Sequence, residues 1–197
     1  MTRTLMCLIG SIFLVGHAFA REPGPDYEQL KAMQWMIGDW EGSWQVQSGA
    51  MLSEAYPVGA KVRTTNAYSW MQNKNYIRLK FRDEIGGKTV HEGLEMIGRD
   101  PKTKKTIHWL FSVIGGSGTG EWQKERDAWV LTWSYTAGDG TMLEGVSYLN
   151  VIDEDTHTWQ MKKMKENGKD IPDTPLIRFH RVNRKGQSTA KADAPKK

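Results

Sequence analysis

Two glutamates are the residues of this sequence best suited to acid–base chemistry. Glu92 and Glu144 each precede a glycine, and each alternates with apolar residues in a stretch typical of a β-strand. A carboxylate on the buried face of a strand needs a partner or has a raised pKa, and either state suits it to proton transfer or to a polar ligand. By the same alternation, Tyr148 and His157 would lie nearby and complete an acid–base pair. The alternative is that both glutamates face solvent or pair with a basic side chain.

Tryptophan is the second residue type that points to a site, because the chain has nine of them. On strands, such side chains either fill a core or line an apolar cavity, and a cavity with a few polar groups is the usual ligand site of a barrel. Both alternatives stay open. The candidates for a ligand pocket are Trp44, Glu92, Trp109, Trp133, Tyr135, Glu144, Tyr148, His157 and Trp159.

Two other motifs are weaker. The glycine-rich run at 115–120 lies between two predicted strands with no helix after it, so it predicts a flexible hairpin loop and not a phosphate site. Four histidines follow residue 20, at positions 91, 108, 157 and 180, and none has the spacing of a metal site. No metal is therefore predicted.

Most of the chain has the periodicity of β-strands, and these strands must position the residues described above. From Gly38 to Val46 glycine, tryptophan and valine alternate with polar residues, which predicts a first strand with one buried face. From residue 61 onward, short alternating segments are separated by turns rich in Gly, Asp and Asn, which is typical of β-hairpins. The predicted strands are 61–71, 75–84, 88–99, 105–114, 119–125, 128–136, 141–152, 156–165 and 175–183.

With the first strand, this makes about ten strands connected as a meander. Closing such a sheet removes its exposed edges, so the sequence predicts an all-β, antiparallel β-barrel. A short helix from about Asp26 to Met36 is expected at one barrel end. Alternation also predicts that Trp109 and Phe111 face inward, with His108 and Ser112 outward.

The chain divides into four segments. Residues 1–20 have a basic start, an apolar run too short for the ~20 residues of a membrane span, and an Ala-x-Ala ending, which predicts a signal peptide and no transmembrane segment after processing. Residues 21–25 are a linker, 26–183 the barrel, and 184–197 a disordered basic tail. The only cysteine is Cys7, so the mature chain has no disulfide. We expect a bacterial protein that is exported, either periplasmic or secreted.

The formal charge of +4 comes from the ends of the chain and not from the barrel. The tail holds five basic side chains against one acidic one, and residues 21–183 have a net charge of −1. A nearly neutral body argues against a nucleic-acid partner.

The segment Gly38-Asp39-Trp40, which follows a short helix and opens the first strand, resembles the Gly-x-Trp signature of lipocalins and the wider calycin barrels. The resemblance implies that Trp40 closes one barrel end with an arginine from the last strand stacked across it. Arg181 is the candidate and Arg178 the alternative. Such a cation–π contact contributes about 1–2 kcal/mol when it is desolvated.

A longer similarity covers residues 28–182. Residues 90–93, 100–103 and 173–181, with Trp109 and Trp129, resemble a family of secreted bacterial lipocalin-like domains of uncharacterised function. The chain lacks the disulfides and C-terminal helix of lipocalins and has about ten strands in place of eight, which favours a calycin-type relative. Related ten-stranded barrels ligate haem through a late histidine, which is His180 by position. Alternation places His180 outside, so no cofactor is predicted.

Three functions follow from these observations. The preferred one is an exported, non-catalytic barrel that binds a small apolar or amphipathic ligand. The first alternative is a cofactor-independent isomerase or hydrolase that uses a carboxylate inside the barrel. The second is an interaction module of the cell envelope with a filled interior and no ligand pocket.

Overall fold

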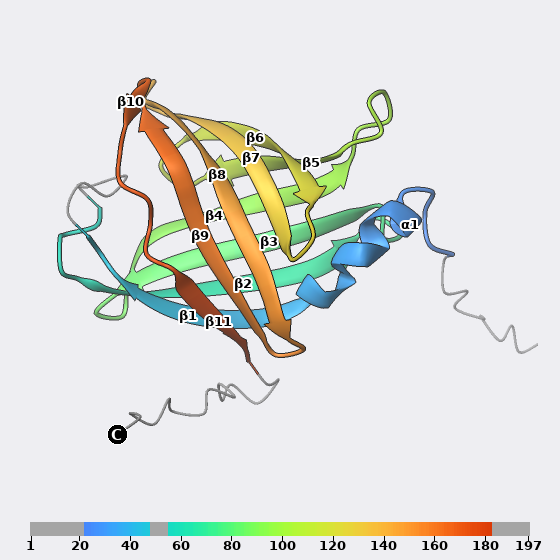
Figure 1. Cartoon of the computed structure of the whole chain (residues 1–197), viewed down its shortest axis with the longest axis horizontal. Helices are drawn as coiled ribbons and strands as arrows, with labels where there is room; N and C mark the ends of the chain where they lie inside the picture. The colour runs from blue at the N-terminus through green and yellow to red at the C-terminus, as the bar shows by residue number, and fades with distance from the viewer. Residues whose placement is uncertain (1–21, 48–54, 183–197) are drawn as a thin grey trace, which may run out of the picture.

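The computed structural model describes residues 22–47 and 55–182. The predicted signal peptide at 1–20 and the predicted tail at 184–197 lie outside these residues. One short α-helix and one 3₁₀ helix precede a continuous set of strands (Figure 1). The elements are α1 (Tyr27–Leu30), η1 (Lys31–Met36), β1 (Gly38–Gln45), β2 (Lys61–Met71), β3 (Tyr76–Ile85), β4 (Lys88–Arg99), β5 (Thr106–Ser112), β6 (Gly116–Lys124), β7 (Ala128–Ala137), β8 (Met142–Asp153), β9 (Thr156–Glu166), β10 (Lys169–Asp170) and β11 (Ile177–Arg181).

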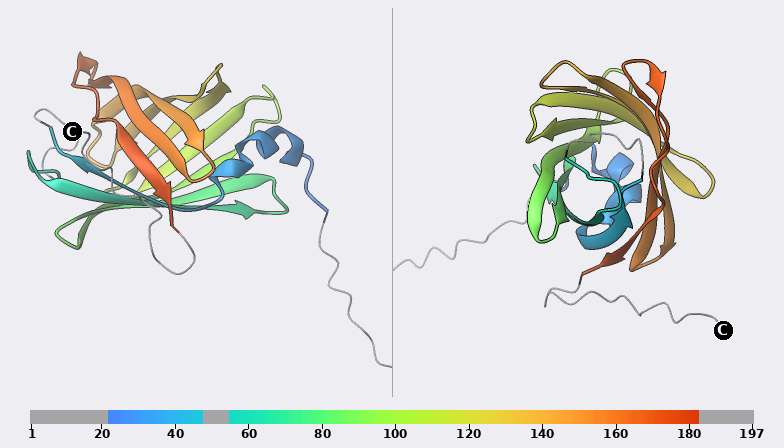
Figure 2. Two further views of the ribbon diagram at one scale, coloured as in Figure 1. Left: turned by 60° about the horizontal axis from the view of Figure 1, so that its bottom comes forward. Right: turned by 90° about the vertical axis from the view of Figure 1, so that its left-hand side faces the viewer.

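The strands form one closed antiparallel meander (Figure 2). Each strand from β1 to β9 pairs with the next, β9 also pairs with β11, and β11 returns to β1. The two-residue strand β10 folds back on β9 and lies outside this ring of ten. The predicted all-β barrel of about ten strands is confirmed.

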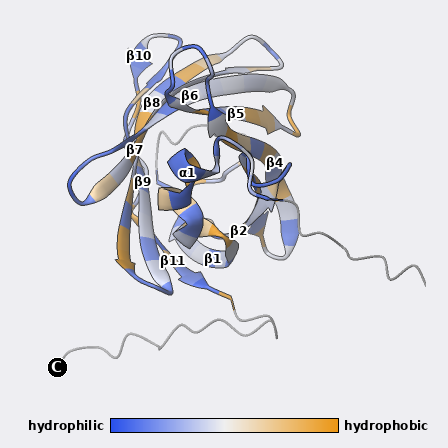
Figure 3. Cartoon of the chain, turned by 90° about the vertical axis from the view of Figure 1, so that its right-hand side faces the viewer, coloured by the Kyte–Doolittle hydropathy of each residue, from blue (hydrophilic) through white to orange (hydrophobic). Residues whose placement is uncertain are grey.

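The helical segment closes one end of the barrel. Figure 3, which looks into this end, shows α1 lying within the ring of strands. Leu30, Met33 and Met36 are buried there, so the apolar face of α1 and η1 caps the core. The indole Nε1 of Trp40 donates to the carbonyl oxygen of Met36 at 2.7 Å and ties β1 to the cap.

The predicted inward face is right for β7 and wrong for β5. On β7, Trp129, Leu131 and Tyr135 are buried. On β5, however, His108 is buried inside the barrel while Phe111 is 50% exposed. Ile107, Trp109 and Phe111 of β5 lie on the outer surface, and His108 and Leu110 face inward, so the more hydrophobic face of this strand is the outer one.

The glycine-rich run is a strand and not the flexible loop that the sequence predicted. Strand β6 begins at Gly116, and the turn before it is tight, with Gly115 N–H donating to the carbonyl oxygen of Ser112 at 3.0 Å. Gly120 pairs with Trp133 on β7. A Cβ atom at Gly120 would lie 2.7 Å from a methyl carbon of Leu131, so glycine leaves room for the large side chains of β7 on the inner face.

Candidate functional site

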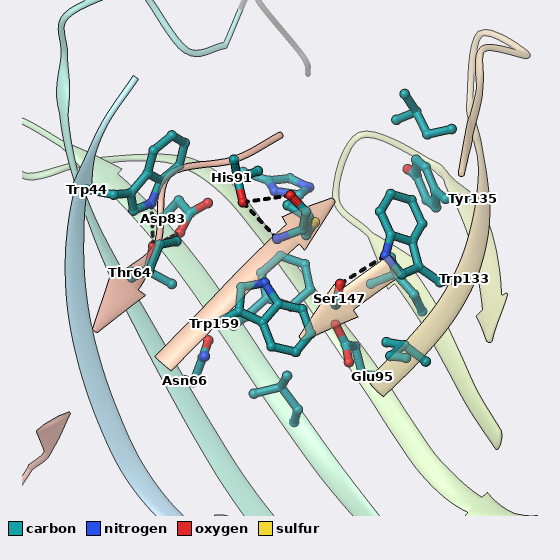
Figure 4. A pocket seen from close by; sticks show the side chains of 18 of the residues that line it. Trp44, Thr64, Asn66, Asp83, His91, Glu95, Trp133, Tyr135, Ser147 and Trp159 are labelled. Carbon is teal, nitrogen blue, oxygen red and sulfur yellow. Dashed lines mark hydrogen bonds between the residues drawn. The ribbon is translucent and has the colours of Figure 1, made fainter. Parts of the chain in front are cut away.

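A cavity of about 220 Å³ lies inside the barrel. Residues 172–175, which follow β10 at the end away from α1, help to line it (Figure 1). Its walls are largely aromatic, and Figure 4 shows tryptophans of β1, β7 and β9 around the same space as several polar side chains. The aromatic lining consists of Trp44, Tyr56, Tyr68, Phe81, Trp122, Trp133, Tyr135, Trp159 and Phe179.

Asp83 is one of two carboxylates from the strands that face this cavity. It accepts hydrogen bonds from the hydroxyl groups of Tyr56 and Thr64, one on each oxygen. The indole Nε1 of Trp44 donates to Thr64 Oγ1 at 3.1 Å and continues the chain of hydrogen bonds. Burial, with the adjacent Asp83 charge, raises the pKa of Tyr56 well above its usual range, so this hydroxyl stays protonated. Both oxygens of Asp83 are therefore satisfied by the protein.

Glu95 is the other. Its Oε2 lies 3.2 Å from Nδ1 of His108, and the two side chains are only 16% and 4% exposed. Strand pairing aligns Leu79, Glu95 and Leu110 on the inner face of β3, β4 and β5. A buried carboxylate–imidazole pair of this kind can bind a polar group or exchange a proton with it.

Two further polar groups lie near these carboxylates. His91 Nε2 is 2.8 Å from Ser112 Oγ, and burial lowers the pKa of His91 although the Asp83 charge opposes this, so the ring is neutral at neutral pH. Burial and the charge of Glu95 raise the pKa of Tyr68, which lines the cavity as a neutral hydroxyl. The interior therefore combines aromatic walls with acids, imidazoles and hydroxyls.

Four of the pocket candidates predicted from the sequence line the cavity. They are Trp44, Trp133, Tyr135 and Trp159. The Nε1 of Trp133 donates to Ser147 Oγ at 3.0 Å, and the hydroxyl of Tyr135 donates to the carbonyl oxygen of Gly115. These bonds fix the orientation of the two rings.

Of the two alternatives for Glu92 and Glu144, the structure shows the one in which both face outward and pair with basic side chains. Glu92 is 42% exposed and pairs with Arg82 at 3.0 Å, and Glu144 is 54% exposed and pairs with Lys165 at 3.2 Å. Both lie on the outer face because strand pairing places their neighbours Gly93 and Gly145 opposite the inward rings of Phe81 and Trp133. The acid–base hypothesis therefore fails for these two residues.

Three other candidates also lie away from the cavity. Trp109 and Tyr148 are on the outer face, where the Tyr148 ring has Lys162 Nζ at 5.7 Å from its centre. His157 is buried, but it is stacked on Phe179 at 5.1 Å and packs against Trp40 at the closed end. Burial, helped by the charge of Arg181, lowers the pKa of His157 to about 3, so it is a neutral core residue at neutral pH.

The contact expected between Trp40 and Arg181 is present. The guanidinium carbon lies 4.1 Å from the centre of the Trp40 ring. Nη1 and Nη2 of Arg181 also donate to the carbonyl oxygens of Ile37 and Trp35 at 2.8 and 2.9 Å. Arg178, the alternative, is exposed on the other face of β11.

The predicted pocket candidates do not include four acidic and histidine residues of the strands that line the cavity: Asp83, His91, Glu95 and His108. A signal existed for Asp83, because it continues the inward series of β3 that ends at Phe81. Glu95 and His91 have the opposite parity to Glu92, so they were excluded by the same wrong choice of face.

The position of His180 does not fit the haem ligand that the resemblance implies. His180 pairs with Glu41 and shares the outer face of the barrel, away from the cavity. Within residues 22–47 and 55–182, no group of three acidic, histidine or cysteine side chains is arranged to hold a metal ion. In the same ranges, none of the helices is long and apolar enough to span a bilayer.

The fold and the site together define a closed, ten-stranded antiparallel β-barrel with an interior cavity. No family model and no curated protein matches this chain. A solved structure that matches is a de novo designed fluorescence-activating β-barrel, with 18% identity, a TM-score of 0.37, and coverage of 76% of this chain and 96% of that one. The likeness is one of barrel architecture alone.

Proposed function

We propose that the barrel binds a small amphipathic molecule non-covalently in its interior cavity. The observation that carries this proposal is the cavity of about 220 Å³, with aromatic walls and buried polar side chains. The volume exceeds the ~150 Å³ of an apolar cavity that admits benzene and is below the ~300–1,000 Å³ of drug-sized pockets. A ligand with one or two rings fits this range.

The energetics of packing also support a ligand. Protein cores contain few voids larger than a water molecule. A bound molecule that fills this partly open space gains packing contacts with the aromatic walls and hydrogen bonds with the polar groups. An interaction module with a filled interior, the second alternative, is disfavoured by the same cavity.

Native mass spectrometry of protein purified from its own host tests the proposal. We expect an additional small mass that leaves when the protein unfolds. The variant Leu110→Phe, which adds volume to the cavity wall, should lose this mass. Leu94→Phe is the matched control, because Leu94 lies on the outer face of β4. An apo mass for the wild-type protein, or equal occupancy of Leu110→Phe, would contradict the proposal.

We also propose that the protein is exported and processed after residue 20, and that it is a calycin-type relative. The support is the signal-like pattern of residues 1–20 and the Gly38-x-Trp40 segment with Arg181 stacked on its tryptophan. Mass analysis of the protein from fractionated cells tests the export. A mature chain that begins at Arg21 in the periplasm or medium is expected, whereas a chain that keeps Met1 in the cytoplasm would refute it.

A second candidate function is proton-transfer catalysis without a cofactor. The Glu95–His108 pair favours it, because a buried acid and imidazole 3.2 Å apart form an acid–base couple. The test is to incubate the co-purified molecule with the protein and to follow its structure by NMR. Conversion that is lost in His108→Gln supports catalysis, and an unchanged molecule supports a carrier.

A further inference from the structure

The charged side chains that line the cavity are unbalanced. Asp83, Glu95 and Asp173 contribute carboxylates, and no lysine or arginine of the described residues is part of the lining. The two lining histidines do not compensate. His91 is neutral at neutral pH, and even a protonated His108 leaves the lining with a net charge of about −2. A negatively charged site attracts cations and disfavours carboxylates.

Two hydrogen-bond acceptors in this site are unused. His108 contacts only Oε2 of Glu95, and Oε1 has no partner among residues 22–47 and 55–182. Tyr68 is 7% exposed and lines the cavity, yet its hydroxyl has no hydrogen-bond partner among the same residues. Strand pairing places Tyr68 and Glu95 on either side of Leu79 in one row of the inner face, and both line the cavity, so the two groups face a shared region. By contrast, both oxygens of Asp83 are already bonded.

We infer that the ligand is an organic cation, a protonated amine on a small ring system, whose ammonium group is held by Glu95 and Tyr68. This inference rests on the proposed ligand-binding function. An ammonium group has donors only, and it would donate to Oε1 of Glu95 and to the hydroxyl oxygen of Tyr68. The ring system packs on the tryptophan walls, and aromatic faces add cation–π attraction for the charged end.

Calorimetric titration with three matched probes tests the charge of the ligand. The probes are 2-phenylethylamine, 2-phenylethanol and 3-phenylpropanoate, which share a phenyl ring and differ in being cationic, neutral and anionic at pH 7. The amine should bind at least about tenfold more tightly than the alcohol, as expected for a charge-assisted hydrogen bond, and the carboxylate most weakly. An alcohol that binds as tightly as the amine would overturn the inference and leave the proposed function standing. Binding by none of the three would overturn both.

Glu95→Gln tests the residue assignment. This substitution should weaken binding of the amine about tenfold and leave the affinity for the alcohol nearly unchanged. Glu92→Gln is the matched control, because it removes a carboxylate from the outer face of the same strand. If Glu95→Gln does not fold, Tyr68→Phe keeps the ring, removes the unpaired hydroxyl, and should weaken the amine several-fold. Unchanged amine affinity in Tyr68→Phe or in folded Glu95→Gln refutes the assignment.

Discussion

The guanidinium group of Arg181 lies 4.1 Å from the centre of the Trp40 ring and joins the last strand of the barrel to the first. Its nitrogens also donate to the carbonyl oxygens of Trp35, Ile37 and Glu154. One side chain thus satisfies carbonyl groups of the helical cap and of the β8–β9 turn. Arg181 therefore connects the helical cap, the β8–β9 turn and the first strand at the closed end of the barrel.

Arg181→Ala should therefore destabilise the barrel by about 2–4 kcal/mol, because it removes the cation–π contact and leaves carbonyl groups unpaired. Urea unfolding followed by tryptophan fluorescence measures the change. Arg178→Ala is the matched control on the exposed face of the same strand and should stay within about 0.5 kcal/mol of the wild type. Equal effects of the two substitutions would show that these contacts of Arg181 do not stabilise the barrel.

The neighbouring His157 should make stability depend on pH. Its pKa is lowered to about 3 in the folded protein, compared with ~6.5 in an unfolded chain, so the unfolded state binds more protons between these values. Stability is complete above about pH 6.5 and falls as the pH drops towards 3. Between pH 7.5 and pH 5 the loss from this group is about 2 kcal/mol.

Urea unfolding of the wild type and His157→Leu at both pH values checks this prediction. The variant should lose less stability on acidification than the wild type, by roughly the same 2 kcal/mol. An identical loss in both proteins would show that His157 is not the titrating group.

Local sequence signals were sufficient to predict the strands and the closure of the sheet into a barrel. Glycine, asparagine and aspartate turns mark both ends of β2 and β4, whose predicted limits of 61–71 and 88–99 agree with the structure. The inward series of β3 was also predicted, because Ile77, Leu79 and Phe81 alternate with charged residues. These features depend on neighbours in sequence, which a periodicity argument can use.

The residues that face the cavity could not be predicted from periodicity alone. On β4 the outward residues Leu94 and Met96 are more apolar than the inward Gly93 and Glu95, so hydrophobicity favours the wrong face. What fixes the face is the pairing of Glu95 with Leu79 across the sheet. On this strand a polar inward face and an apolar outward face conflict with the usual pattern, and such local conflicts are expected at functional or strained sites.

Gly120 tests whether glycines of β6 make room on the inner face. In Gly120→Ala the new Cβ would lie 2.7 Å from the Thr132 carbonyl oxygen and from a Leu131 methyl carbon. Because backbone must move, we expect destabilisation of about 1–3 kcal/mol, measured by thermal or urea unfolding. Thr119→Ala, on the exposed face of the same strand, should change stability by less than about 0.5 kcal/mol. A neutral Gly120→Ala would mean that β6 is not tightly packed.

Asp83 tests the polar network that the sequence analysis missed. Asp83→Asn keeps the shape of the side chain but replaces one acceptor oxygen with an NH₂ group, which cannot accept the hydroxyl hydrogen bonds of both Tyr56 and Thr64. We expect a loss of about 1–3 kcal/mol in unfolding free energy. Glu92→Gln breaks only an exposed ion pair with Arg82 and should cost no more than about 1 kcal/mol. If the two substitutions cost the same, the hydrogen bonds from the Tyr56 and Thr64 hydroxyls to Asp83 do not stabilise the barrel as the structure indicates.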